Sequence, residues 1–335
     1  HFARTFGVHR IVNVSELTDR FGLLAVGLVA FIAVMMALYG LAELASRRNR
    51  SRLVATVFLF PAVLFLAVGL VYPAIRTIIM SFFDGDGDTF IGLTNYGWAL
   101  TDPDALQILI NTALWIIVVP LVSTALGLVY AVLIDGRRGE SAYKALVFLP
   151  MGISFVGASI IWKFVYQYTA SGDQIGLLNQ ILTWFGASPI NWLNTFPLNN
   201  FLLMVVLVWI EVGFATVVLS AALKGVPVEI VEAARIDGAN PTQIFWNVTV
   251  PSIRSAIIVV AVTVFIATLK LFDIVRAMTG GHHGTDVLAH NMWEQAFRLG
   301  NTGRGATMAV LLFALVIPVV IYQVRNMRRQ ELEAR

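Results

Sequence analysis

Seven long apolar runs constrain this chain more than any other feature of its sequence. Each run is long enough to cross a hydrocarbon core of about 30 Å as a helix. Because backbone N–H and C=O groups in hydrocarbon need internal hydrogen-bond partners, the runs are expected to be helical. The sequence therefore predicts an all-α, polytopic membrane protein with about seven transmembrane helices. The runs are Phe21–Ala45, Val54–Phe82, Ala105–Ile134, Ala145–Tyr168, Phe201–Leu223, Ile253–Ile274 and Ala306–Val324.

Composition supports the membrane class and excludes several others. Hydrophobic residues make up 58% of the chain and charged residues only 13%, about half the charged share of a soluble domain. The chain has no cysteine, which excludes disulfides, thiolate catalysis and cysteine-based zinc sites. It also has no P-loop sequence, so it cannot itself hold ATP phosphates in that way. Basic residues in short loops indicate membrane topology, and no nucleic-acid partner is expected.

The loops between the runs predict the orientation. Arginine and lysine gather in one alternating set of loops, whereas Asp84–Asp104 and Thr169–Asn200 of the other set contain neither. The positive-inside rule then places the C-terminus in the cytoplasm. We expect two parts: residues 1–53, an extra N-terminal segment with one membrane anchor, and residues 54–335, a six-helix core. A short surface helix is expected within Gly172–Asn200, where apolar residues recur near helical spacing.

One cytoplasmic loop, residues 224–252, has a pattern of its own. Pro227 is placed like a first helical residue, where its missing N–H costs nothing. Asn240, Pro241 and Gln243 have the order of a capping box at the start of a second helix. The loop is therefore predicted to be a helix–turn–helix at the inner membrane face, with its first helix running to about Ala239.

Within this loop the sequence resembles a known family. Glu232-Ala233-Ala234, then Gly238, then Val248, Val250 and Pro251 are similar to the EAA motif of binding-protein-dependent ABC importer permeases. In that family the loop is the coupling helix, which docks in a cleft of the ATPase subunit. The resemblance implies that this loop contacts the ATPase through Glu232, Ala233, Ala234, Asp237, Gly238 and Pro251.

The resemblance continues from about Val54 to the C-terminus and is nearest to the α-glucoside permeases of the maltose-type group. After Thr279-Gly280-Gly281, where that family often has Gly-Pro, this chain has His282-His283. The other matching segments are Ile91–Tyr96, Asn111-Thr112, Leu149-Pro150, Gly176–Asn179, Asn191–Leu193, Phe272-Asp273, Glu294, Ala296-Phe297 and Gly305-Ala306.

The resemblance implies a type I ABC importer transmembrane domain in the bacterial inner membrane, forming half of a sugar pathway. Its implied partners are a second permease, two ATPase subunits that use ATP and Mg²⁺, an extracytoplasmic solute-binding protein and membrane lipid. No cofactor, metal or catalytic residue is expected in this chain. An ion-driven secondary transporter or channel is the alternative, although repeated halves typical of that class are not found. A membrane-embedded enzyme would need paired aspartates or HExxH, which are also missing.

Polar and aromatic residues within spans are candidates to line the sugar path, because they are costly against lipid. Each has a plainer interpretation: Lys270 and Asp273 can pair on one helix, Trp209 can anchor at the interface, and Met151 and Phe155 can simply pack. The candidate substrate residues are Met151, Phe155, Trp209, Glu211, Thr268, Lys270 and Asp273.

Two further patterns are interpreted as ordinary loops. Asp84–Asp88 resembles the start of a calcium loop but lacks the glycine and glutamate that an EF-hand needs later. His282, His283 and His290 lack the cysteine or acidic cluster that would favour a metal site.

Overall fold

The computed structural model describes residues 51–333 together with residues 26, 29, 36 and 40. Apart from those four positions, the first predicted span, Phe21–Ala45, lies outside the described residues. In the described part, the only strand pairing is an isolated bridge between Phe83 and Phe90, so the all-α prediction is confirmed. The longer helices are α2 (Ser51–Leu66), α3 (Tyr72–Met80), α5 (Pro103–Ile134), α7 (Phe155–Val165), α9 (Leu198–Lys224), α13 (Arg254–Leu269) and α16 (Thr302–Glu333). The shorter ones are α4 (Thr94–Thr101), α6 (Glu140–Phe148), α8 (Leu177–Trp184), α10 (Val228–Ile236), α11 (Pro241–Ile244), α12 (Val250–Ser252), α14 (Asp273–Met278) and α15 (Leu288–Trp293).

Membrane-spanning candidates agree with the six spans predicted after residue 53. Four stretches are long and apolar enough to cross a membrane: Leu59–Met80, Pro103–Ile134, Leu198–Lys224 and Thr302–Arg325. Two bent helix pairs bring the number in the described part of the chain to six if each pair is one crossing. The chain divides into two units between Arg76 and Thr77, and the rest of the fold described below belongs to the second unit.

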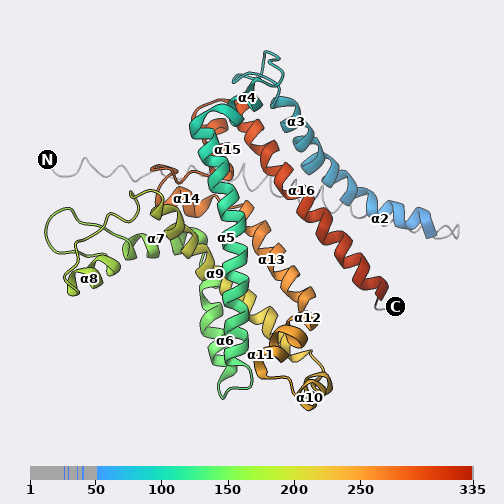
Figure 1. Ribbon diagram of the computed structural model, residues 1–335. Coiled ribbons are helices and arrows are strands. Elements are labelled where there is room, and N and C mark those ends of the chain that lie inside the picture. Colours follow the sequence, from blue (N-terminus) through green and yellow to red (C-terminus); the bar gives the residue numbers. More distant parts are fainter. Residues whose placement is uncertain (1–25, 27–28, 30–35, 37–39, 41–50, 334–335) are drawn as a thin grey trace. The chain divides into compact units, whose positions relative to one another are not determined.

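The centre of the second unit is the pair α5 and α9, with α13 packed along both (Figure 1). Their contact is close because small residues face each other. A Cβ atom on Gly127 of α5 would lie 2.4 Å from the Cβ atom of Ala215 in α9. Lipid provides no strong hydrophobic force between helices. Small residues at the contact stabilise the pair because they let the two backbones approach and gain van der Waals contacts.

Two of the predicted spans are broken. Between α6 and α7 the axis turns by 99°, at a 3-10 turn over Leu149–Gly152 that contains Pro150. The Ser154 hydroxyl then accepts a hydrogen bond from the Gly157 N–H and caps α7. Pro150 favours this bend, because proline has no N–H to donate to the preceding turn.

The predicted span Ile253–Ile274 was wrong as one continuous helix. It ends at Leu269, and a new helix, α14, begins at Asp273. Lys270 caps α13 with its backbone N–H bonded to the carbonyls of Ala267 and Thr268. Lys270 and Asp273 therefore do not share a helix, and the ion pairs found in the described part of the chain do not join them. Packing of Leu271 and Ile274 into the core accompanies the break.

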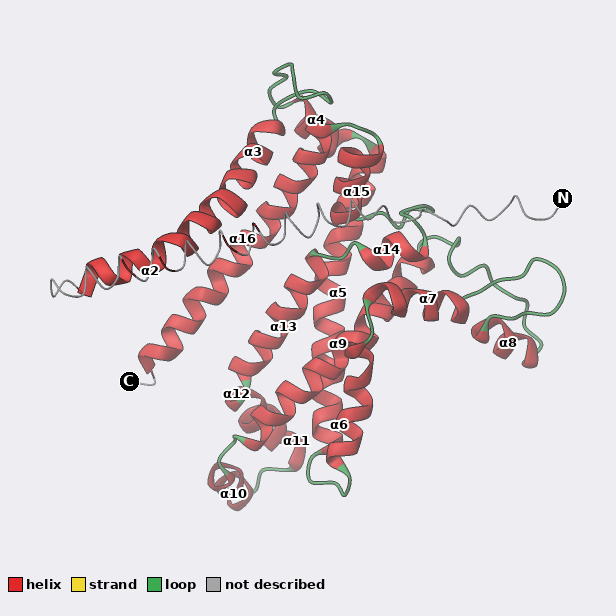
Figure 2. Ribbon diagram, turned by 180° about the vertical axis from the view of Figure 1, so that it is seen from behind, coloured by secondary structure: helices red, strands yellow, loops and turns green. Residues whose placement is uncertain are grey.

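The helix ends of α5 and α9 define two ends of this unit. The end that holds α10–α12 is called the coupling end, and the opposite end, near Pro103 and Leu198, the distal end (Figures 1 and 2). A short helix is found within Gly172–Asn200, as expected, and is α8.

Candidate functional site

The coupling end carries the helical hairpin that the sequence predicted. The α10 helix runs from Val228 to Ile236, so Pro227 caps it rather than being its first residue, and it ends three residues before the expected Ala239. The second helix begins with a complete capping box. Asn240 Oδ1 accepts from the Gln243 N–H at 2.9 Å, and Gln243 Oε1 accepts from the Asn240 N–H at 2.9 Å. These bonds satisfy backbone donors that a helix start leaves free.

The residues between α10 and α11 are open to a partner. Gly238 has a φ of +86° and nothing within 4 Å of a Cβ built on it. This left-handed conformation favours glycine and ends α10 sharply. Of the other candidate coupling residues, Glu232, Ala233, Asp237 and Pro251 are exposed and Ala234 is half-buried.

Several large apolar side chains on the same hairpin are exposed. Ile236 is 86% exposed and Trp246 is 60% exposed, and Val228 and Ile230 are also exposed. Exposed large apolar side chains of this kind are typical of surfaces that bind another protein.

A charged contact joins the end of α9, where the loop 224–252 begins, to α6. Glu140, the first residue of α6, accepts from Lys144 at 2.5 Å and from Lys224 at 2.7 Å. Lys224 is the last residue of α9 and the first residue of the loop 224–252. The Glu140 side chain is 15% exposed, so it is more protected from water than Lys224 at 53%. The contact fixes the start of the coupling loop against α6.

The candidate substrate residues are divided between the interior and the two helix breaks. Trp209 packs edge-on against Trp162 of α7, with ring centroids 5.7 Å apart. Glu211, two residues after Trp209 in α9, is 7% exposed. No hydrogen bond or ion pair is found for its carboxylate within the described part of the chain. Thr268 is buried and donates to the Val264 carbonyl at 2.8 Å.

The remaining candidates lie at the two helix breaks. Met151 is 44% exposed in the 3-10 turn before α7, and Phe155 packs against the central core as the first residue of α7. Lys270 is exposed and Asp273 is half-buried at the second break. These side chains therefore lie at two separate helix breaks and do not form one continuous surface.

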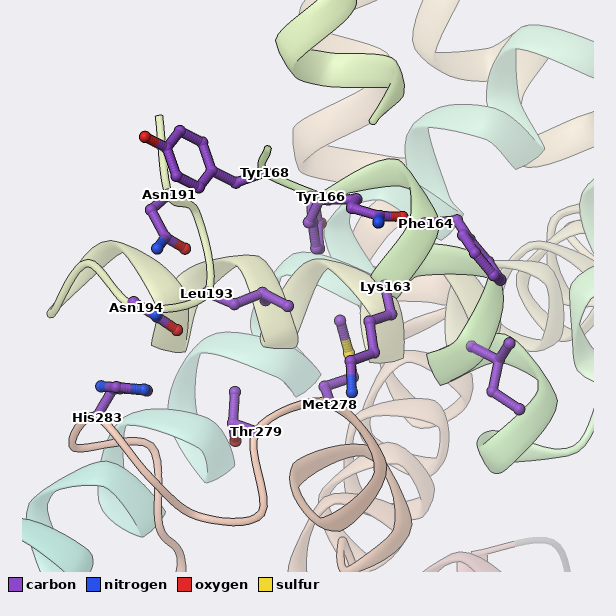
Figure 3. A pocket seen from close by; sticks show the side chains of 12 residues that line it. Lys163, Phe164, Tyr166, Tyr168, Asn191, Leu193, Asn194, Met278, Thr279 and His283 are labelled. Carbon is purple, nitrogen blue, oxygen red and sulfur yellow. The ribbon is translucent and has the colours of Figure 1, made fainter. Parts of the chain in front are cut away.

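A pocket of about 560 Å³ lies near the distal end and is lined by none of these candidates (Figure 3). Its lining comes from α7, from the loop before α9, and from α14 with the loop that follows it. Part of this lining stood out in the sequence, because Asn191 and Thr279 lie in the matched segments and His283 in the unusual His-His pair. The lining residues are Ile160, Lys163, Phe164, Tyr166, Gln167, Tyr168, Asn191, Leu193, Asn194, Met278, Thr279 and His283.

A buried amide network holds the loop that forms one wall of this pocket. Asn111 of α5 donates to the carbonyls of Gly284 and Asp286 at 2.7 and 2.8 Å. Asn200 of α9 donates to Asn111 Oδ1 at 2.7 Å and accepts from the Trp115 indole at 2.8 Å. Asn111 and Asn200 are almost fully buried, so each bond replaces one that water would otherwise make. The network ties α5, α9 and residues 284–286 together.

Asp84 and His290, from the two loops interpreted as ordinary, use their side chains in internal hydrogen bonds. Asp84 accepts from the N–H groups of Gly87 and Asp88, and backbone hydrogen bonds, from Thr89 first, hold the pKa of Asp84 below its usual value. His290 is 1% exposed, and its Nδ1 lies 2.7 Å from Asp286 Oδ1. Within the described part of the chain, no group of three or more His, Asp or Glu residues is placed to hold a metal ion.

Comparison with known proteins agrees with this architecture. A solved bacterial ABC transporter "involved in the import of the acidic polysaccharide alginate" superimposes with a TM-score of 0.72, at 19% identity, over 86% of this chain and 99% of that chain. This likeness identifies the fold as that of an ABC importer transmembrane domain.

Sequence comparison identifies the family. The pattern described as "Binding-protein-dependent transport system inner membrane component" matches residues 117–331. The osmoprotective compounds uptake permease protein GgtC of Synechocystis is 49% identical, over 82% of this chain and 99% of that protein. The alpha-glucoside transport system permease protein AglF of Rhizobium meliloti is 48% identical, over 82% of each chain.

A more distant relative is the trehalose/maltose transport system permease protein MalF of Thermococcus litoralis, 32% identical over 72% of this chain and 81% of that protein. The chain belongs to the family of inner membrane components of binding-protein-dependent transport systems. It is a multi-pass membrane permease subunit of an ABC importer, and the ion-driven alternative is not supported.

Proposed function

We propose that this chain forms half of the translocation pathway of a bacterial ATP-driven sugar importer, with its C-terminus in the cytoplasm. The observation that carries the ATP-driven part is the uncovered hairpin at the coupling end, where Ile236 and Trp246 are largely exposed. A capped, rigid helix with an apolar surface suits docking in a cleft of an ATPase subunit. The contact residues are Glu232, Ala233, Ala234, Asp237, Gly238 and Pro251.

The proposed complex contains a second permease, two ATPase subunits that bind ATP and Mg²⁺, and an extracytoplasmic solute-binding protein. This chain supplies no cofactor of its own. Conformational change in the ATPase reaches the spans through the ends of α9 and α13, because the hairpin connects these two helices.

The proposed substrate class is an α-glucoside. Similarity to AglF and MalF supports this class, whereas the equally similar GgtC is named for osmoprotective compounds. Trp209 can offer an aromatic face, and the Glu211 carboxylate, without a partner among the described residues, can accept hydrogen bonds from sugar hydroxyls. The proposed path residues are Met151, Phe155, Trp209, Glu211, Thr268, Lys270 and Asp273.

The test is ATP hydrolysis by the reconstituted importer, with its binding protein, across a panel of solutes. Maltose, sucrose and trehalose are compared with osmoprotective compounds of other chemical classes and with unrelated amino acids. Stimulation by the α-glucosides is the expected result. Stimulation only by another solute would overturn the substrate class but keep the importer, and uptake that needs an ion gradient instead of ATP would overturn both.

A further inference from the structure

The distal pocket has the composition of a small-molecule site. Its volume of about 560 Å³ lies within the roughly 300–1,000 Å³ typical of ligand pockets. Figure 3 shows Asn194 and His283 on one side of it and Lys163 with Met278 on the other. The three chain segments that meet here are far apart in sequence, so the pocket depends on the tertiary fold.

Hydrogen-bonding groups in the pocket are free to receive a ligand. No hydrogen bond is found for the side-chain amides of Asn191 and Asn194 within the described part of the chain. The Lys163 ammonium makes a single long contact, 3.4 Å from the Ala277 carbonyl. The lining also includes aromatic rings, Tyr168 among them, but neither Asp nor Glu.

This combination matches the chemistry of a neutral sugar. Amides can both donate to and accept from hydroxyl groups, and Lys163 can donate to them, while a tyrosine ring covers the apolar face of a sugar ring. A cationic ligand is disfavoured because Lys163 is positive and the lining contains no carboxylate to balance it.

The backbone fixes His283 in the pocket wall. Its φ of +56° is the only positive value for a residue other than glycine in the described part of the chain. The Asn199 side chain donates to the His283 carbonyl at 2.9 Å, and Asn111 donates to the next carbonyl, that of Gly284. Histidine tolerates this conformation better than most residues, and these buried bonds offset its cost. The imidazole is therefore presented from a rigid turn.

We propose that the distal pocket, centred on Lys163, Asn191, Asn194 and His283, is a second sugar site that binds one glycosyl unit of an α-glucoside. It is separate from the path residues at the helix breaks and rests on the proposed function for its substrate class. Its place at the distal end fits a solute that has just left the binding protein and has not reached Trp209.

The experiment measures sugar binding and transport with the assembled importer. Binding of maltose and sucrose to the detergent-purified complex, without binding protein or ATP, is followed by saturation-transfer NMR. ATP-driven uptake into proteoliposomes gives KM and kcat for each sugar presented on its binding protein. Two pocket variants are compared: His283→Asn, which suits a positive φ, and Asn194→Leu, which removes the amide at similar size.

Each variant is expected to weaken sugar binding and raise KM about three- to tenfold, since each loses one or two hydrogen bonds, with kcat nearly unchanged. His282→Asn is the matched control, because His282 is exposed, adjacent and does not line this pocket. It should behave as the wild type.

Three results would overturn the proposal. The first is unchanged sugar binding and KM in both pocket variants. The second is weaker docking of the binding protein, measured by fluorescence titration, with direct sugar binding intact, which would make the pocket a protein contact. The third is wild-type uptake of these sugars with no direct binding signal that depends on the pocket. Failure of the proposed function differs from all three, because the wild type would then neither take up nor bind the sugars.

Discussion

Replacing Gly127 by alanine should destabilise the protein although alanine is the better helix former. The added methyl group would lie 2.4 Å from the Ala215 Cβ atom and 3.0 Å from the Thr216 backbone nitrogen. Ordinary contact begins near 3.4 Å, so α5 and α9 must separate locally by about 1.0 Å (3.4 − 2.4).

The expected change in the free energy of unfolding for Gly127→Ala is the sum of two opposing contributions. Overpacking of this kind costs about 1–3 kcal/mol, and the upper end applies because backbone atoms of α9, which cannot rotate away, are among the contacts. Alanine regains about 1 kcal/mol over glycine within a helix. The net loss expected for Gly127→Ala is therefore about 2 kcal/mol.

The assay is thermal unfolding of the purified protein in detergent at one fixed scan rate, because membrane proteins often unfold irreversibly. Gly97→Ala in α4 is the matched control, since Gly97 has nothing within 4 Å of its added Cβ atom. The control should raise the midpoint slightly, whereas Gly127→Ala should lower it. Adding Ala215→Gly to Gly127→Ala should recover part of the loss, because the contacts with the α9 backbone remain. A midpoint for Gly127→Ala at or above that of Gly97→Ala would refute the reasoning.

Three further variants test the coupling end and the sugar path. Gly238→Trp should reduce ATP-driven uptake by at least tenfold while membrane insertion stays normal, because the bulky ring blocks docking; normal uptake would exclude a docking role. Glu140→Gln should lower the ratio of uptake to ATP hydrolysis about two- to threefold by releasing Lys224, and an unchanged ratio would show that this contact is not used in coupling. Trp209→Ala should raise the KM for sugar severalfold with basal ATP hydrolysis retained, and an unchanged KM would remove Trp209 from the path.

Local patterns in the sequence predicted local structure well. The capping box of Asn240 and Gln243 was found as predicted because both partners lie within one turn of chain. The kink at Pro150 was also predictable, since proline constrains the chain wherever it stands. Apolar length was enough to predict the four continuous spans after Val54, because hydrocarbon selects for it regardless of tertiary detail.

Features that depend on distant residues were not predictable in this way. The break after Leu269 has no proline or glycine to mark it, and Leu-Lys-Leu-Phe fits a continuing helix. The break becomes visible in the structure, where Leu271 and Ile274 pack into the core. Asn194 and His283 are 89 residues apart in the chain (283 − 194), so the sequence alone could not place them in one pocket. The buried carboxylate of Glu211 was singled out because charge within an apolar run is rare.

The uncovered hairpin also has a consequence for how the subunit is produced in the cell. In the proposed importer, a copy that has inserted into the membrane but lacks its ATPase would expose Ile236 and Trp246 on the cytoplasmic side, as an incompletely folded chain would. Chaperones and proteases that recognise such residues cannot distinguish the two cases. The lifetime of the subunit should therefore follow the supply of its ATPase, so that excess copies are removed and the stoichiometry of the importer is kept without separate control of each gene.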